Sequence, residues 1–423
     1  MNTVELFPHQ ARALEKTKDL NHVAYYHDMG LGKTYTGSEK LISIGAEVNL
    51  VICQKSKIDD WIDHFESNYT LDIFDLTKPN EMEGFLTSMV PKVGIINYEM
   101  AFRRPKLAQL HDFTLMLDES SLIQNENAKR SKFILNKLHP ANVILLSGTP
   151  TGGKYENLWS QLHLLGWKIS KDLYWKQYVE VEYIDNEGFP IKVVRGYKNV
   201  DRLKAKMRAY GCDFLKTDEV FNLPDQIWES VVIPTNREYG VMRKDHIVQI
   251  GENELVGDTI LKRMLYERML CGHYNDAKLE ALKDLMLSTE ERLIIFYNFN
   301  DELRAIEDIC IELDKPLSIV NGQTKDLSCY EEYNDSITAI QYQAGAMGLN
   351  LQKANRMIYF TPPVSSELYE QSKKRIHRIG QDATCFYYKL VCRNSIEEKI
   401  YQNLALRRDY TDELFIQDTE VKN

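Results

Sequence analysis

The sequence predicts an α/β protein with two units, each a parallel β-sheet covered by helices, and a largely helical insertion between them. The first observation is that short apolar runs alternate with segments of helical periodicity across residues 22–150, and again across residues 292–360. The second is that this alternation is lost between residues 158 and 276, where aromatic and charged residues are mixed. A chain of 423 residues with 43% hydrophobic content is long enough for two or three domains.

Apolar runs in the first half are expected to form parallel strands, because each is short, ends in polar residues and precedes a helical pattern. In parallel sheets, ligands bind at the carboxyl ends of the strands. Functional side chains are therefore expected where each run ends. The expected strands of this half cover residues 22–26, 48–53, 93–99, 113–119 and 143–150.

The motif His-Asp-Met-Gly-Leu-Gly-Lys-Thr follows the first expected strand and is typical of a phosphate-binding loop. Gly30 and Gly32 would allow a tight turn, and the first N–H groups of the next helix would face an anion. Lys33 would bind the outer phosphates, and Thr34 would place its hydroxyl on a magnesium ion. The alternative is a chance Gly-Lys-Thr at a helix start, since His27 stands where the strict pattern has its first glycine.

Two adjacent carboxylates, Asp118 and Glu119, end another expected strand. One could hold magnesium, directly or through water, while the other orients and deprotonates the attacking water. A helix cap is the alternative for this dipeptide alone. Ser147 and Thr149 lie in a turn after a further strand and are candidates for sensing what is bound, with an ordinary turn as the alternative.

Gln10 opens a helical pattern near the N-terminus. Its amide offers a donor and an acceptor side by side, which suits the edge of adenine. A solvated glutamine at a helix start fits the position equally well, so both interpretations stay open.

The middle of the chain predicts helices and one small hairpin but no catalytic chemistry. Residues 178–184 and 189–194 are β-prone and flank Asp-Asn-Glu-Gly, which is a turn signal. The basic cluster at 202–208 is most simply a solvated helix face. We expect the first unit at 1–165, the insertion at 166–275 and the second unit with a C-terminal helix at 276–423.

The second half has no phosphate loop, but two arginines in it are candidates for phosphate chemistry. Arg375 and Arg378 lie three residues apart, and on a helix this spacing puts both guanidinium groups on one face. There they could reach a γ-phosphate as arginine fingers do, whereas structural arginines on an exposed helix are the alternative. The expected strands of this half cover residues 292–299, 317–322, 337–342 and 356–360.

Composition excludes several classes of protein. The seven cysteines form no Cys-x-x-Cys pair and no zinc-like cluster, which indicates reduced thiols and a cytosolic compartment. No run approaches the roughly 18 apolar residues of a membrane span, and the N-terminus lacks a signal-peptide pattern. The net charge of −10 argues weakly against a sequence-independent nucleic-acid coat but leaves room for a local basic groove.

These motifs together resemble the Swi/Snf-like branch of the superfamily 2 helicases, which are ATP-driven double-stranded DNA translocases. The resemblance covers nearly the whole chain in the right order and is most specific at His-Arg-Ile-Gly-Gln, residues 377–381. The matching segments are 6–10 for the adenine-reading motif, 28–34 for motif I, 118–119 for motif II, 146–150 for motif III, 345–351 for motif V, 371–381 for motif VI, and 221–224 and 395–400 for the middle segment and the C-terminal brace helix.

The resemblance implies two RecA-like lobes with ATP and Mg²⁺ in the cleft between them. It assigns nucleotide binding to Gln10, Gly30, Gly32, Lys33, Thr34 and Asp118, magnesium to Thr34 and Asp118, and catalysis to Glu119, Arg375 and Arg378. It places DNA phosphate near Gln54, Lys55, Ser56, Tyr98 and Gly345, and coupling at Ser147, Thr149 and Gln371.

Three positions depart from the family pattern. His27-Asp28 replaces the usual Asp-Glu, Ser121 stands where a histidine is common, and Ala346 replaces the second glycine of motif V. We expect these changes to affect coupling more than hydrolysis, because the residues that would carry the chemistry remain.

The expected protein is a monomeric motor on double-stranded DNA, with no membrane partner. Its compact length resembles minimal phage or bacterial members, which suggests the cytoplasm of a bacterium or a phage-infected host. An RNA helicase would share the nucleotide residues. A nucleotide-gated DNA clamp with little turnover would account for the departures, although the intact Lys33 and Glu119 favour the motor.

Overall fold

A computed structural model gives the fold, and it describes residues 5–186, 189–251, 253–345 and 349–415. Within these residues, no helix combines the length and apolar composition that crossing a membrane requires.

Contacts divide the chain into two compact units, the first formed by residues 1–220 with 409–423 and the second by residues 221–408. This division differs from the expected separate insertion at 166–275. The reason is that β9 (Cys212–Leu215) joins the first sheet, whereas β10 (Gln226–Ile233) joins the second. Residues 166–220 of the expected insertion therefore belong to the first unit, and residues 221–275 belong to the second.

The first unit is built on a seven-stranded parallel sheet with the order β3-β4-β2-β5-β6-β1-β9. Its central strands are apolar throughout, because helices bury both faces of a parallel sheet. Successive side chains of one strand, Val23 and Ala24, belong to opposite core layers. The strands are β1 (His22–His27), β2 (Val48–Cys53), β3 (Asp72–Asp75), β4 (Lys92–Asn97), β5 (Thr114–Asp118), β6 (Asn142–Leu146) and β9.

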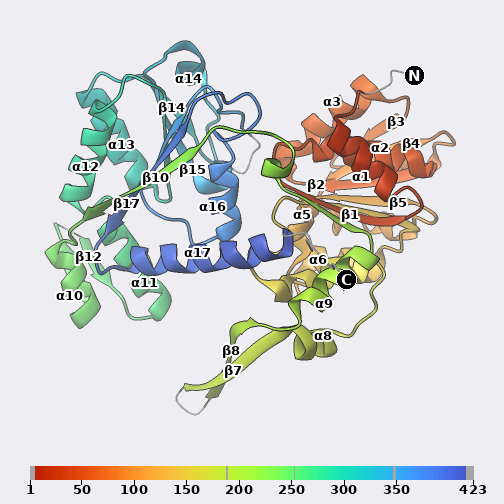
Figure 1. The fold of residues 1–423 in the computed structure, drawn as a ribbon, viewed down its shortest axis with the longest axis horizontal. Coiled ribbons are helices and arrows are strands. Elements are labelled where there is room, and N and C mark those ends of the chain that lie inside the picture. The colour runs from red at the N-terminus through yellow and green to blue at the C-terminus, as the bar shows by residue number, and fades with distance from the viewer. Residues whose placement is uncertain (1–4, 187–188, 252, 346–348, 416–423) are drawn as a thin grey trace, which may run out of the picture. The chain divides into compact units, whose positions relative to one another are not determined.

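Helices cover both faces of this sheet, and α1 and α2 pack against each other on one of them (Figure 1). Trp61 and Phe65 of α3 belong to the same core layer as these two helices. The helices of the unit are α1 (Pro8–Lys16), α2 (Lys33–Ile44), α3 (Ile58–Asn68), α4 (Glu81–Thr87), α5 (Tyr98–Ala101), α6 (Lys129–Lys137), α7 (Trp159–Leu164), α8 (Lys171–Tyr178) and α9 (Val200–Ala209). Short 3₁₀ turns are η1 (Lys55–Lys57), η2 (Pro105–Gln109), η3 (Ser120–Ile123), η4 (Tyr155–Leu158) and η5 (Thr217–Glu219).

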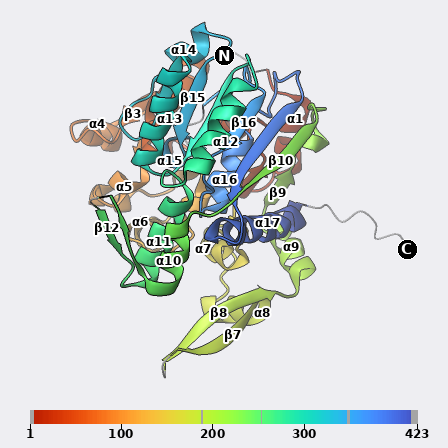
Figure 2. The same cartoon turned by 90° about the vertical axis from the view of Figure 1, so that its left-hand side faces the viewer.

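The expected hairpin is confirmed as an antiparallel pair, β7 (Val179–Asn186) and β8 (Phe189–Tyr197). Of its expected turn, residues 187–188 lie outside the described part of the chain. Both views show the hairpin extending away from the sheet of the first unit, beside α8 (Figures 1 and 2).

The second unit contains a six-stranded parallel sheet with the order β10-β17-β16-β13-β15-β14. The prediction of two helix-covered parallel sheets is therefore confirmed. The strands are β10, β13 (Leu293–Tyr297), β14 (Leu317–Val320), β15 (Ile337–Gln341), β16 (Arg356–Tyr359) and β17 (Cys385–Cys392), with a separate hairpin of β11 (Ile247–Ile250) and β12 (Asn253–Val256). The helices are α10 (Arg237–Asp245), α11 (Ile260–Cys271), α12 (Asp276–Leu287), α13 (Asn300–Glu312), α14 (Ser328–Glu332), α15 (Tyr342–Gly345), α16 (Ser366–Lys373) and α17 (Ile396–Phe415), of which the last begins in this unit and ends among the residues assigned to the first.

A fully buried carboxyl, Glu302, caps the start of α13. Its Oε2 accepts hydrogen bonds from the backbone N–H groups of Asn298 (2.7 Å) and Phe299 (3.1 Å), and from the Thr361 hydroxyl (3.0 Å). Its Oε1 has no hydrogen-bond partner among the described residues. Burial raises the pKa of Glu302 to about 7.

We expect Glu302→Gln to stabilise the protein at pH 8 more than at pH 5. Because the folded-state pKa is raised, the protonated Glu302 contributes to the free energy of unfolding. This contribution is fully present below the unfolded pKa of 4.5 and is lost as the pH rises through about 7. A glutamine carbonyl in place of Oε2 keeps the three hydrogen bonds without the buried charge. The variant should gain at most about 3 kcal/mol in free energy of unfolding at pH 8, because each unit of difference between the two pKa values of Glu302 corresponds to about 1.36 kcal/mol.

Thermal unfolding at both pH values measures this effect, with the exposed Asp308→Asn on the same helix as the control. An equal shift of Tm at pH 5 and pH 8 would contradict a buried, ionising carboxyl at Glu302.

Candidate nucleotide site and second arginine site

The candidate phosphate loop connects β1 to α2 in the first unit. Its two glycines adopt left-handed backbone conformations, with φ of 84° at Gly30 and 69° at Gly32. A side chain at position 32 would also meet Gln10, whose Nε2 lies 2.3 Å from the position of an added Cβ. Glycine is therefore required at position 32 by both conformation and space.

Lys33, the first residue of α2, points its ammonium group back into the loop. Its Nζ donates to the backbone carbonyls of His27 (2.9 Å) and Asp28 (3.1 Å). The next residue, Thr34, is half-buried on the first turn of the helix. The loop thus presents a cation and a hydroxyl at a helix N-terminus, which is the donor set that binds the phosphates and metal of a nucleotide.

The structure places Gln10 against this loop. The side chain is buried, its Oε1 accepts from Phe7 N (2.8 Å), and its Nε2 donates to Gly32 O (3.0 Å). The neighbouring His9 Nε2 forms a hydrogen bond with Leu31 O (2.9 Å). The expected solvated alternative for Gln10 is therefore wrong, because its amide connects the start of α1 to the phosphate loop.

Asp118 and Glu119 lie at the carboxyl end of β5, which is separated from β1 only by β6. Both therefore lie at the same edge of the sheet as Lys33. Glu119 adopts a left-handed backbone, with φ of 53°. A non-glycine residue in this conformation stores strain of order 1–3 kcal/mol, and such strain concentrates at functional sites.

The Asp118 carboxylate is held by a residue that we did not predict. Trp61 of α3 donates its indole N–H to Asp118 Oδ2 at 2.9 Å. Burial raises the pKa of Asp118, against the lowering effects of the Trp61 hydrogen bond and the Lys33 charge. The position of Trp61 in the apolar repeat of its helix indicated only a core residue, so nothing in the sequence pointed to this contact.

The expected coupling residues of the first unit lie on the turn after β6, beside the phosphate loop. Ser147 is buried and donates to Glu119 Oε2 at 3.4 Å, and it also accepts from Thr149 N at 3.2 Å. A Cβ added at Gly148 would lie 3.4 Å from Lys33 Nζ. This turn therefore contacts the water-activating candidate and the phosphate-binding candidate at once.

The unusual His27 is a buried partner of β9. Its Nε2 forms a hydrogen bond with Asp213 Oδ2 at 2.8 Å, and burial lowers its pKa. Lys16 pairs with the other Asp213 oxygen at 2.5 Å, and Asp28 accepts from Thr217 N (3.2 Å). His27 and Asp28, which differ from the family pattern, thus connect the phosphate loop to β9 and η5 through hydrogen bonds.

The residues expected to contact DNA differ in exposure. Lys55 and Ser56 are exposed on η1, and Gln54 before them is half-buried. Tyr98 is fully buried, and its hydroxyl donates to Asp118 O (2.9 Å) and Glu119 O (3.3 Å). In this structure, Tyr98 therefore lies behind the acidic pair and offers no surface to a phosphate.

Arg375 and Arg378 of the second unit contact one acceptor, Leu349 O, at 3.5 and 3.4 Å. The expectation that they share a helix face is wrong, because α16 ends at Lys373 and both arginines lie in the turns that follow. Arg375 is buried, and burial lowers the pKa of Arg378. The turns nevertheless bring the two guanidinium groups together, as the spacing suggested.

The remaining motif residues of the second unit are mainly buried. Gln371 lies on α16, and its Oε1 has no hydrogen-bond partner among the described residues. His377 bonds to Pro224 O (2.8 Å), and Gln381 donates to Ala354 O (2.8 Å). Gly345 ends α15, and the departure at Ala346 lies outside the described residues.

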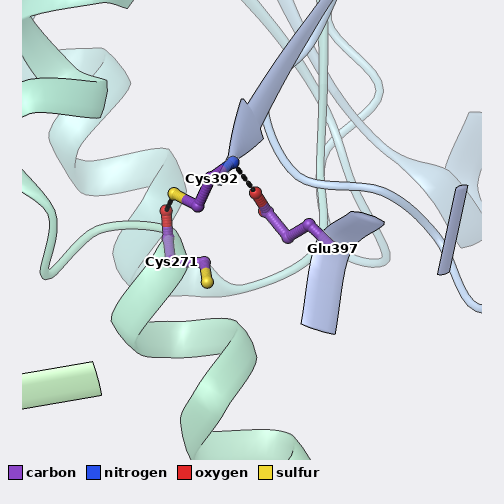
Figure 3. Close-up of side chains that lie close together, drawn as sticks. All are labelled: Cys271, Cys392 and Glu397. Carbon is purple, nitrogen blue, oxygen red and sulfur yellow. Dashed lines mark hydrogen bonds between the residues drawn. The ribbon is translucent and has the colours of Figure 1, made fainter. Parts of the chain in front are cut away.

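Cys271, Cys392 and Glu397 form a buried cluster whose ligand atoms lie within 4.8 Å of one another (Figure 3). The hydrogen bonds argue against a metal ion there. Glu397 Oε1 pairs with the Lys278 ammonium (2.6 Å), and its Oε2 accepts from Cys392 N (2.9 Å). Cys392 Sγ donates to Cys271 O (3.4 Å), so the cation in this core is a lysine.

Comparison with known proteins identifies the family. Residues 21–275 match the SNF2-related domain, and residues 277–380 match the helicase conserved C-terminal domain. The chain belongs to the SNF2-related family. The two matches meet near residue 276, whereas the two compact units of this SNF2-related chain divide at residue 220.

Relatives of this SNF2-related chain include longer proteins. It is 24% identical to the Mus musculus SWI/SNF-related matrix-associated actin-dependent regulator of chromatin subfamily A member 1, over 90% of this chain and 40% of that protein. It is 24% identical to the Saccharomyces cerevisiae ISWI chromatin-remodeling complex ATPase ISW1, over 93% of this chain and 38% of that protein. It is 26% identical to the Saccharomyces cerevisiae DNA repair and recombination protein RAD26, over 71% of this chain and 31% of that protein. The chain thus spans less than half the length of these relatives.

A solved structure, the Sulfolobus solfataricus SWI2/SNF2 ATPase core in complex with dsDNA, is similar over 97% of this chain and 92% of that one. Its sequence identity is 21% and its TM-score is 0.45.

Proposed function

We propose that this protein is a motor that hydrolyses ATP and uses the energy to move along double-stranded DNA. The observation that carries the proposal is the placement of Lys33, Asp118 and Glu119 at one edge of the first sheet, with the Lys33 charge acting on Asp118. Membership of the SNF2-related family supports it. So do relatives named as a remodelling ATPase and as a DNA repair and recombination protein.

In the proposed reaction, Lys33 and the glycines of the loop bind the phosphates of ATP, and Gln10, which is hydrogen-bonded to Phe7 N and Gly32 O, is proposed to contact the adenine. The residues present fit a magnesium ion. Trp61 occupies only one oxygen of Asp118, and Thr34 follows Lys33 on α2. Bound through Thr34 and Asp118, magnesium would supply positive charge to the phosphate oxygens.

Glu119 is proposed to orient the attacking water and accept its proton, with Ser147 holding the carboxylate. Arg375 and Arg378 are proposed to stabilise the charge that develops on the transferred phosphoryl group, when the second unit closes on a nucleotide held by the first. Their common contact with Leu349 O keeps the two guanidinium groups close together. Ser147, Thr149 and Gln371 would report the state of the nucleotide to the rest of the chain.

Duplex DNA is the proposed track. Lys55 and Ser56 are exposed on a short turn at the carboxyl edge of the first sheet, which offers a cation, a hydroxyl and backbone N–H groups to a phosphate. Gln54 precedes η1 in the first unit and Gly345 ends α15 in the second, and both are proposed to lie near the DNA backbone. We propose that the protein acts as a monomer on this track.

The test is ATP hydrolysis by the purified protein alone and with double-stranded DNA, single-stranded DNA or RNA, with Glu119→Gln as the blank. We expect duplex DNA to give the strongest stimulation and the blank to remove it. Stimulation by RNA alone would assign the protein as an RNA helicase. Duplex binding without turnover would assign a nucleotide-gated clamp instead.

A further inference from the structure

Helix α3 connects the proposed DNA contact to the acidic pair. The exposed residues Lys55 and Ser56 lie on η1, and α3 begins directly after it at Ile58. Trp61 is on the first turn of this helix. Only four residues therefore separate the exposed Ser56 from Trp61, whose indole contacts Asp118, and the intervening backbone is helical throughout.

The contact between Trp61 and Asp118 has little freedom to adjust. Only 2% of Trp61 is exposed, and its ring packs against His64 and Phe65, each with a centroid separation of 5.7 Å. The indole N–H has Asp118 Oδ2 as its acceptor at 2.9 Å. A shift of the first turn of α3 would therefore move the donor and turn the carboxylate with it.

A second element reaches the same pair from β4. Tyr98 begins α5, is fully buried, and donates its hydroxyl to the backbone carbonyls of Asp118 and Glu119. The segment from η1 to α3, which carries the exposed DNA-contact candidates, thus has a direct hydrogen bond to the Asp118 side chain, and the buried Tyr98 bonds to the backbone of the same pair.

We propose that Trp61 is a positioning residue that couples the binding of duplex phosphates at Lys55 and Ser56 to the orientation of the Asp118 carboxylate. Tyr98, which is buried and does not reach DNA itself, keeps the backbone of the pair in place for this coupling. The inference rests on the proposed function for the identity of both ligands. Because coupling between two binding sites is reciprocal, bound nucleotide must also change the affinity for DNA through the same contact.

The experiment measures the equilibrium Kd for a fluorescent DNA duplex, with and without Mg²⁺ and a non-hydrolysable ATP analogue. In the wild type, we expect the analogue to change the Kd by a factor of about 5–150. In Trp61→Phe, which keeps most of the ring packing and removes the N–H donor, we expect this factor to fall towards one. The readout is binding and does not depend on turnover.

Trp159→Phe is the matched control. Trp159 is half-buried, whereas Trp61 is buried, but its indole N–H also donates to an oxygen at 2.9 Å, the Ile169 carbonyl, so the change removes a similar hydrogen bond away from the acidic pair. We expect it to keep the wild-type factor. Lys55→Ala combined with Ser56→Ala should weaken duplex binding both with and without the analogue, which separates loss of binding from loss of coupling.

An unchanged factor in Trp61→Phe would overturn the inference, and so would a wild type that binds duplex but shows no response to the analogue. A wild type that binds no duplex would overturn the proposed function itself. Should Trp61→Phe fail to fold, Tyr98→Phe removes only one buried hydroxyl and tests the second contact in the same assay. A wild-type factor in that variant would then count against coupling through the acidic pair.

Discussion

Replacing Glu119 with glutamine should lower kcat for ATP hydrolysis by about 10²–10⁴-fold, the usual contribution of a positioned general base. Glutamine has nearly the same shape and can still accept the Ser147 hydrogen bond, but it does not take a proton from water. Because Lys33 and the phosphate loop are unchanged, nucleotide affinity should stay within a few-fold of the wild type. Steady-state turnover and equilibrium binding of a fluorescent nucleotide measure the two quantities.

Glu83→Gln supplies the control for this change, because Glu83 is an exposed glutamate on α4 whose partner is Lys106. It should leave kcat unchanged. If Glu119→Gln hydrolysed ATP at the wild-type rate, Glu119 would not be the base, and the proton would have to go to another group.

Replacing Arg378 with alanine should lower kcat by about 10³–10⁵-fold, which is the contribution of an arginine finger in phosphoryl transfer. The reason is that a half-buried guanidinium, less screened by water, stabilises negative charge more strongly than an exposed one, and partial burial lowers the pKa of Arg378. Nucleotide affinity should change little, since the phosphate loop lies in the first unit. Single-turnover hydrolysis separates the chemical step from product release.

Arg304→Ala is a suitable comparison, because Arg304 is exposed on α13. Its ion pair with Asp301 lies on the surface, where such pairs contribute little to stability. Full activity of Arg378→Ala would remove Arg378 from the site. A variant that loses nucleotide binding as well as turnover would point instead to a structural role in the turns after α16.

The central strands of both sheets were predictable because their sequences are continuous apolar runs, as at residues 48–53 and 293–297. Strands β9 and β10 were not. β9 has only four residues, and β10 is an edge strand with most of its side chains exposed, so neither has the pattern of a buried strand. Their sheet membership is set by long-range pairing with β1 and β17.

The candidate site was predictable where short motifs bear chemistry directly, as at Lys33 and Glu119. The helix expected around Arg378 was wrong because backbone carbonyls there accept long-range hydrogen bonds in place of helical ones: Lys373 O accepts from the Tyr387 hydroxyl (2.8 Å), and Arg375 O accepts from Leu351 N (3.2 Å). Trp61 could not be found from sequence, since an aromatic residue on the apolar face of a helix is usually core.

The left-handed backbone at Glu119 also bears on how the chain can change over generations. A glycine or asparagine would fit this conformation with less strain than glutamate does. Position 119 is thus one where the backbone conformation and the proposed water activation favour different amino acids. On the proposed role, a chain that no longer hydrolysed ATP would gain stability from glycine or asparagine at this position, so the glutamate has its reason in the reaction and not in the fold.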